Sequence, residues 1–183
     1  MKPISQTQAL ERLKNIQADL RSEISNFESR AKSCLTCDTP GACCLDAHFV
    51  NVHISRLEAA AIAHLLNDLP ADLQSRVSQR IDDAIATYGL TTEGDTFAMT
   101  YACPLFEKGV GCLVHSTAKP VPCTVHACYE NKADLPPDDL QSAAEKQIDA
   151  LNTRAYTQLQ PLLPLPVAIK RLMPKPRHPR RAL

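Results

Sequence analysis

The sequence predicts a mainly α fold, a small helical domain with two cysteine-rich loops and at most short β-strands. In four segments, apolar residues recur every three or four positions, as they do on the buried face of an amphipathic helix. All eight cysteines of the 183 residues fall in two blocks, which the helical segments flank. Only 4% of the residues are aromatic and none is Trp, so we expect a core of Leu, Ile, Val and Ala.

The first helical segment covers residues 7 to 32. Its apolar stripe consists of Leu10, Leu13, Ile16, Leu20, Ile24, Phe27 and Ala31. We therefore interpret residues 1–33 as an N-terminal amphipathic helix that packs on the rest of the chain. A coiled coil with a protein partner is the alternative, which a stripe of this length does not establish.

Residues 34–160 are interpreted as a helical domain that carries the cysteine cluster and binds metal. The first cysteine block contains Pro40 and Gly41, which favour a loop. Residues 48–54 alternate in polarity, which predicts a short strand. Ser55 and Glu58 form a capping box at the start of a helix that we expect to end near Leu69.

A further helix is predicted from Pro70 to a C-terminal cap at Gly89, because proline is tolerated in a first turn and glycine favours the cap. Residues 90 to 133 look irregular, with short strands at 96–101 and 112–115. The last helix is expected to run from about residue 134 to about residue 160.

Residues 161–183 are predicted to form an extended basic tail. Six of these 23 residues are proline and six are Lys or Arg, and no Asp or Glu occurs after Asp149. Such a tail could contact nucleic acid or an acidic protein. We do not favour nucleic acid as a partner, since charge runs are usually solvated and no aromatic residues are interleaved to stack on bases.

The chain is expected to be cytoplasmic and to have no membrane partner. No apolar run follows Met1, as a signal peptide would require, and no stretch approaches the roughly 20 apolar residues of a membrane helix. Cysteines stay reduced in that compartment, so clustered thiols indicate metal ligands before disulfides.

The two cysteine blocks predict a bound zinc ion or iron–sulfur cluster, because thiolate is a soft ligand that suits both. The short spacing of Cys34 and Cys37 lets two sulfur atoms of one turn reach one centre. The predicted metal ligands are Cys34, Cys37, Cys43, Cys44, Cys103, Cys112, Cys123 and Cys128.

The doublet Cys43-Cys44 leaves the number of centres open. Adjacent side chains of an extended segment point to opposite sides, so the two thiols are awkward partners on one ion. Either they serve two centres or only one of them is a ligand. His115 and His126 lie inside the second block and are further candidate ligands, the kind that an open zinc site would use.

The order and context of these motifs resemble a known family. The residues are Cys34-x2-Cys37-x5-Cys43-Cys44, Cys103-Pro-Leu-Phe, Gly111-Cys112-Leu-Val-His115 and Lys119-Pro120-Val-Pro-Cys123. Over roughly residues 34 to 128 they resemble the YkgJ-type cysteine-cluster proteins, described as a zinc- or iron-chelating domain. The resemblance implies metal ligation by the seven cysteines of these motifs, with Cys128 as an addition.

Three functions are compatible with the sequence. The first is a protein that binds metal without catalysis of its own. The second is an iron–sulfur enzyme, because the family is similar to flagellin lysine methylase, which implies methyl transfer from S-adenosylmethionine or redox chemistry. The third is a module that binds nucleic acid or protein through the basic tail. No glycine-rich nucleotide loop and no Gly-x-Ser-x-Gly motif occurs, so these two kinds of site have no support in the sequence. Whether the chain is an enzyme stays open.

Overall fold

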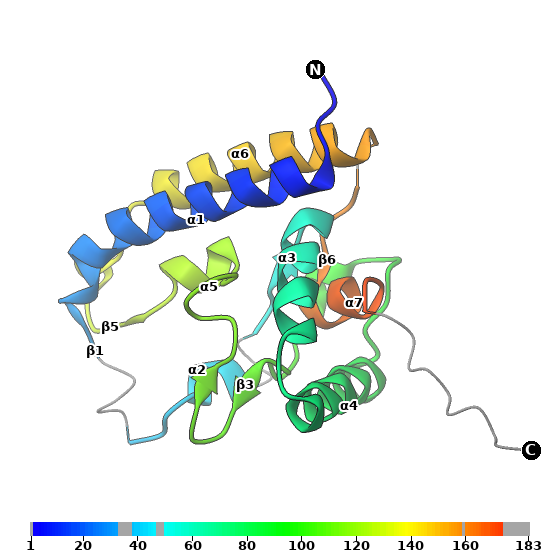
Figure 1. The fold of residues 1–183 in the computed structure, drawn as a ribbon. Coiled ribbons are helices and arrows are strands. Elements are labelled where there is room, and N and C mark those ends of the chain that lie inside the picture. The colour runs from blue at the N-terminus through cyan, green and yellow to red at the C-terminus, as the bar shows by residue number, and fades with distance from the viewer. Residues whose placement is uncertain (1, 33–37, 47–49, 159, 174–183) are drawn as a thin grey trace, which may run out of the picture.

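The computed structural model of the chain describes residues 2–32, 38–46, 50–158 and 160–173. Within these ranges the chain consists of seven α-helices joined by short segments, and every strand is two residues long (Figure 1). The predicted mainly α fold with short strands is therefore confirmed. Two of the predicted metal ligands, Cys34 and Cys37, lie outside the described residues.

Two long helices lie side by side along one edge of the molecule, α1 (Gln6–Glu28) and α6 (Asp138–Tyr156) (Figure 1). They are antiparallel, since the Ile4 N–H before α1 donates to the Arg154 carbonyl near the end of α6 at 3.2 Å. Their facing stripes form one apolar core together with Leu57 and Val121. The buried members on the two helices are Ala9, Leu13, Leu20, Ile24, Ala144, Ile148 and Leu151.

A second core lies between α3 (Arg56–Asn67), α4 (Ala71–Tyr88) and α7 (Leu165–Lys170). The capping box predicted at the start of α3 is present, because the Ser55 hydroxyl accepts from the Glu58 N–H and the Glu58 carboxylate accepts from the Ser55 N–H. Gly89 caps α4 in the left-handed conformation, as predicted.

The prediction of an extended tail is wrong for the first part of residues 161–183. Strand β6 (Leu163–Pro164) pairs antiparallel with β2 (His53–Ile54), and α7 follows directly. All residues of α7 except Lys170 are buried. Prolines at the first positions of a helix leave no hydrogen bond unmade, so the apolar residues between them can pack into the second core. Residues 174–183 lie outside the described part of the chain.

Smaller differences concern the irregular segments. Thr96–Ala98 is a 3-10 helix where a strand was predicted. Of the strand predicted at 48–54, the structure describes residues 50–54, and only 53–54 of these pair. The helix expected from residue 134 begins at Asp138, because Pro136 and Pro137 precede it. It ends at Tyr156, and Thr157 follows in the left-handed region with φ of 56°.

Among the described residues, three two-stranded pairs complete the fold. They are β1 (Ala31–Lys32) with β5 (Cys128–Tyr129), β2 with β6, and β3 (Phe106–Glu107) with β4 (Gly111–Cys112). Two further short helices, α2 (Ala42–Leu45) and α5 (Val121–Val125), carry cysteines, and a second 3-10 helix spans Lys132–Asp134. In the part of the chain that the structure describes, no helix is both long and apolar enough to cross a membrane.

Candidate metal centre

The cysteine doublet lies on a short helix, α2, and not in the extended loop that the sequence suggested. Gly41 precedes α2 with φ of 80°, and its carbonyl accepts hydrogen bonds from the N–H groups of Cys44, at 2.9 Å, and Leu45, at 3.0 Å. Successive side chains on a helix are about 100° apart and not opposite. Cys43 and Cys44 therefore differ in direction without facing opposite sides of the segment.

The second block forms a small hairpin that brings two cysteines together. Cys103 begins the turn that leads into β3, and Cys112 lies in β4, directly opposite Phe106. The Phe106 N–H donates to the Cys103 carbonyl at 3.5 Å, and the His115 N–H donates to the Cys112 carbonyl at 3.1 Å. Each cysteine thus starts a tight turn of the chain.

The two blocks are joined directly. The Cys103 N–H donates to the Cys44 carbonyl at 2.7 Å, so α2 lies against the start of the hairpin. Gly41 also faces the ring of Phe106, since a Cβ atom at position 41 would stand 2.1 Å from the ring atom Cζ. No residue with a side chain fits at that contact without moving the ring.

Four of the thiols influence one another's ionisation. Burial, followed by the negative charges of Cys103, Cys43 and Cys112, raises the pKa of Cys44 to about 12. Burial and the charge of Cys112 raise the pKa of Cys103 to about 11. Burial raises the pKa of Cys123 further above its usual range, and the charges of Cys103, Cys112 and Cys44 add to it. We call Cys44, Cys103, Cys112 and Cys123 the thiol cluster.

Other groups around the thiol cluster favour the thiolate form. Although burial is the larger effect on the pKa of Cys103, the backbone N–H groups of Leu105 and Phe106 and the charge of Arg80 act against it. Burial also dominates at Cys112 and Cys123, and there the positive charge of Lys119 lowers the pKa of both thiols. Two cationic side chains therefore act on the cluster, Arg80 from α4 and Lys119 from the segment before α5.

Arg80 is held in place by the turn after Cys103. From α4, its Nε donates to the Pro104 carbonyl at 2.9 Å, and its Nη1 donates to the Glu107 carboxylate at 2.7 Å. Its Nη2 is buried and makes no hydrogen bond with any residue that the structure describes. Sequence reasoning missed Arg80, because 24 residues separate it from Pro104 and no local pattern links them.

The segment that carries Lys119 is fixed by polar residues of α1. The amide of buried Gln17 donates to the Lys119 carbonyl at 3.2 Å, and Arg21 donates to the Ser116 carbonyl at 2.8 Å. This segment leads into α5, which carries Cys123. The N-terminal helix therefore positions part of the candidate site, which its amphipathic stripe did not indicate.

The remaining predicted cysteines are placed differently. Cys43 is half-buried and contributes a hydrogen bond and a charge to its neighbour Cys44. Cys128 is exposed on β5, where its partner across the strand pair is Lys32. The pairing puts Cys128 beside the backbone that leads into the first block. His115 and His126 are both exposed.

The donor set suits a thiophilic metal, since the thiol cluster offers four sulfur ligands. Within the described ranges, no group of three or more His, Cys, Asp or Glu side chains is arranged to hold one metal ion. The residues therefore fit zinc or an iron–sulfur cluster by their chemistry, and binding requires the sulfur atoms to turn toward one point.

The other histidines do not extend this site. Buried His53 stacks on the ring of Phe97, with ring centroids 4.2 Å apart. Burial lowers the pKa of His53, which favours the neutral ring. His64 is exposed on α3, and His178 lies outside the described residues.

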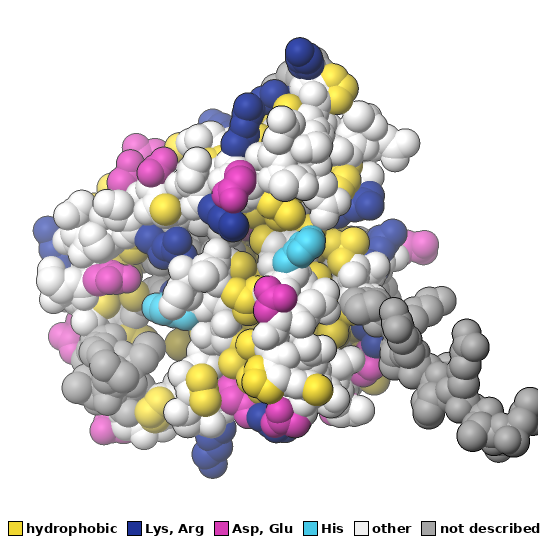
Figure 2. Space-filling view, in the orientation of Figure 1, with side chains coloured by type: hydrophobic (Ala, Val, Ile, Leu, Met, Phe, Trp, Pro, Cys, Tyr) yellow, Lys and Arg dark blue, Asp and Glu magenta, His cyan; other side chains and the backbone are white. Residues whose placement is uncertain are grey.

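The face of the molecule in Figure 2 bears on binding to nucleic acid. Lys and Arg side chains are interspersed there with Asp and Glu side chains among the residues shown in colour (Figure 2). Such a mixture differs from the clustered basic surface that phosphate binding uses.

No protein-family model, curated protein or solved structure matches this chain.

Proposed function

We propose that the chain is a metal-binding protein that holds zinc or an iron–sulfur cluster through the cysteines of its two blocks. The observation that carries this proposal is the thiol cluster, whose four half-buried thiols lie near enough for their charges to affect one another's ionisation. Buried cysteines with a purely structural role have no need to gather, because each packs as a small apolar residue.

The charges of the cluster support the same proposal. Burial raises the pKa values of Cys44, Cys103 and Cys123, and repulsion from the neighbouring thiolates raises them further. A bound cation replaces the thiol protons and offsets this repulsion. A zinc ion would supply structural closure, whereas an iron–sulfur cluster would supply a centre that carries electrons. Arg80 and Lys119 would balance the remaining negative charge.

Within the doublet, Cys44 is the better ligand. Its ionisation responds to Cys103 and Cys112, and its carbonyl accepts from the Cys103 N–H. Cys43 acts on Cys44, its neighbour in the chain. We assign Cys44 to the centre formed with the second block, and Cys43 to a supporting position or to a second centre that includes Cys34, Cys37 and Cys128.

Metal analysis of protein purified without air tests the proposal. We expect a stoichiometric content of zinc or iron, with visible absorption in the iron–sulfur case. Cys44→Ser should lose most of the metal of the cluster, whereas Cys43→Ser should retain that part. A wild-type protein with almost no zinc and no iron contradicts metal binding, and equal losses in the two variants contradict the assignment of Cys44.

A cytoplasmic location belongs to the same proposal, because a reducing compartment keeps the eight thiols available as ligands. Protein expressed in the cytoplasm should therefore carry more metal than protein exported to an oxidising compartment. Equal metal content in the two preparations would argue against this part.

A further inference from the structure

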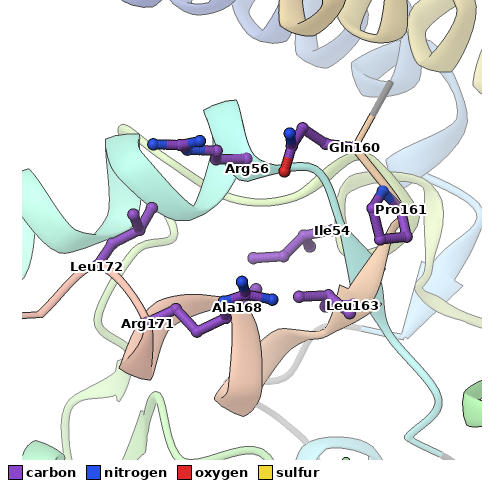
Figure 3. Close-up of a pocket in the computed structure, with 8 residues that line it drawn as sticks. All are labelled: Ile54, Arg56, Gln160, Pro161, Leu163, Ala168, Arg171 and Leu172. Atoms are coloured by element: carbon purple, nitrogen blue, oxygen red, sulfur yellow. The ribbon is translucent and has the colours of Figure 1, made fainter. Parts of the chain in front are cut away.

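A pocket with no cysteine in its wall lies where the C-terminal segment joins the body of the molecule. It is lined from β2, α3, β6, α7 and the residues beside them, and its volume is about 190 Å³ (Figure 3). Its floor consists of three apolar residues that are themselves buried in the fold, Ile54, Leu163 and Ala168. In Figure 3, Ile54 points into the space between Arg56 and Arg171.

The rim of this pocket is cationic. Arg56 and Arg171 lie on opposite sides of it, and Gln160 adds an amide (Figure 3). No Asp or Glu is among the described residues that line it. Neither arginine forms an ion pair with any residue that the structure describes. Two guanidinium groups beside a neutral, apolar surface create a place where a negative charge is favourable.

Arg56 is also held in a fixed position. Its guanidinium carbon lies 4.2 Å from the centre of the Tyr156 ring, the geometry of a cation–π contact. Stacking on an aromatic face leaves the edge of a guanidinium group open to hydrogen-bond acceptors. The stacked group therefore keeps N–H donors for a ligand, with less side-chain entropy to lose on binding.

The size of the pocket limits the ligand. A dry protein cavity of about 150 Å³ is known to hold benzene, so a pocket of about 190 Å³ has room for a six-membered ring and a small polar group. An arginine fork matches the two oxygen atoms of a carboxylate. We propose that this pocket binds a small organic carboxylate, with its apolar body on the floor and its carboxylate group at Arg56 and Arg171.

Benzoate is the probe for this proposal, with benzyl alcohol as a neutral molecule of similar shape. We expect benzoate to shift the NMR signals of residues around α7 in the full-length protein, with an affinity that falls as salt is added. Benzyl alcohol should bind at least about tenfold more weakly, because a hydrogen bond to a charged group carries about that factor. Inorganic phosphate, which has no apolar body, should also bind more weakly than benzoate.

Variants separate the charge of the pocket from its shape. Arg171→Met and Arg56→Met should each weaken benzoate binding about tenfold or more, whereas Arg12→Met, which removes an exposed charge on α1, should leave it unchanged. Ala168→Leu keeps both arginines but fills the floor, and it too should weaken binding. Thermal unfolding of each variant, compared with that of the wild type, serves as the control for folding.

Any of three results overturns the proposal. One is equal affinity for benzoate and benzyl alcohol, which would show that the arginines do not act on the ligand. A second is unchanged benzoate binding in both arginine variants. A phosphate affinity above that of benzoate would equally overturn it, because the apolar floor would then have no role.

Discussion

At the scale of single residues, Gly41 sets how closely the two cysteine blocks approach. A side chain is unfavourable at this position for two separate reasons, the φ of 80° and the contact with the Phe106 ring. Gly94 shares the first reason, with φ of 78°, but a Cβ atom there would meet no atom within 4 Å. Comparing substitutions at the two glycines therefore distinguishes the cost of backbone strain from the cost of disturbing the contact between the blocks.

Gly41→Ala should be more destabilising than Gly94→Ala. The left-handed conformation alone costs alanine about 1–2 kcal/mol, so both variants should lose about that much free energy of unfolding. Gly41→Ala should lose about 1–3 kcal/mol more, because the Phe106 ring must move. Urea unfolding measures both values. Equal losses would show that the ring is displaced without cost and that the contact does not hold the blocks together.

Arg80 and Arg76 allow a comparison on one helix face. Both reach the Glu107 carboxylate, Arg80 at 2.7 Å and Arg76 at 3.6 Å, but Arg80 also holds the Pro104 carbonyl. Arg80→Met should lower the free energy of unfolding by about 2 kcal/mol, because it leaves a carbonyl and a carboxylate without their donor. Arg76→Met should cost less than about 1 kcal/mol, as a half-exposed ion pair does. Chemical denaturation of the two variants checks the order.

At the scale of elements, α7 shows how a proline-rich segment becomes part of a core. Ile169 is 0% exposed, whereas Leu162, just before β6, is 45% exposed. Ile169→Ala should cost about 2–4 kcal/mol of unfolding free energy, and Leu162→Ala less than about 1 kcal/mol. Thermal unfolding compares them. Similar small losses would mean that this segment does not pack as described.

The capping box of α3 contains a buried carboxyl group with a pH-dependent effect. Burial raises the pKa of Glu58 above its ordinary value of 4.5, although hydrogen bonds from Ser55 and the Val121 N–H oppose the shift. The folded state therefore keeps this proton to a higher pH than the unfolded state. Its contribution to stability is complete below about pH 4.5 and is lost as the pH rises through the raised pKa.

Glu58→Gln should remove this dependence, since an amide does not titrate and still completes a capping box. The stability of the variant relative to the wild type should increase as the pH rises above about 4.5. Denaturant titrations at several pH values measure the difference. Glu11→Gln, at an exposed position on α1, should leave the slope unchanged. A relative stability that decreases with pH contradicts the burial of the carboxyl group.

At the scale of the whole molecule, the two cores meet along α3. Leu57 belongs to the core under α1 and α6, Ile62 belongs to the core with α4 and α7, and Ala61 packs against both. Because one helix contributes to both cores, opening either of them exposes apolar surface of the other. We expect the described part of the chain to unfold as one cooperative unit.

Substitutions in the two cores test this coupling. Leu13→Ala lies in one core and Val77→Ala in the other, and both side chains are 0% exposed. Each should lower the midpoint of a single transition, with a loss of about 2–4 kcal/mol for Leu13→Ala and somewhat less for Val77→Ala. Circular dichroism and tyrosine fluorescence should report the same midpoint. Two separated transitions in either variant would show that the cores are independent.

Local sequence patterns predicted much of the fold. The stripes of α1, α3, α4 and α6 and the Ser55 and Gly89 caps depend on residues within a few positions of one another, and the structure has them close to where they were predicted. The strand pairs were not predictable in the same way. Two paired residues have no periodicity, and in β1–β5 and β2–β6 the partners lie far along the chain, as Leu163 does from Ile54.

The sequence by itself determined the helical class, the helix caps and the confinement of the cysteines to two blocks, because these follow from short-range geometry and composition. Metal binding remains a prediction from the same blocks. Only the tertiary structure decided that Cys44 faces the second block, that Arg80 adjoins the thiol cluster, and that residues 163–170 enter the core. These features depend on contacts between residues that are distant in the sequence. The free energy of such contacts depends on burial and charge in the folded chain, so no local sequence pattern predicts it.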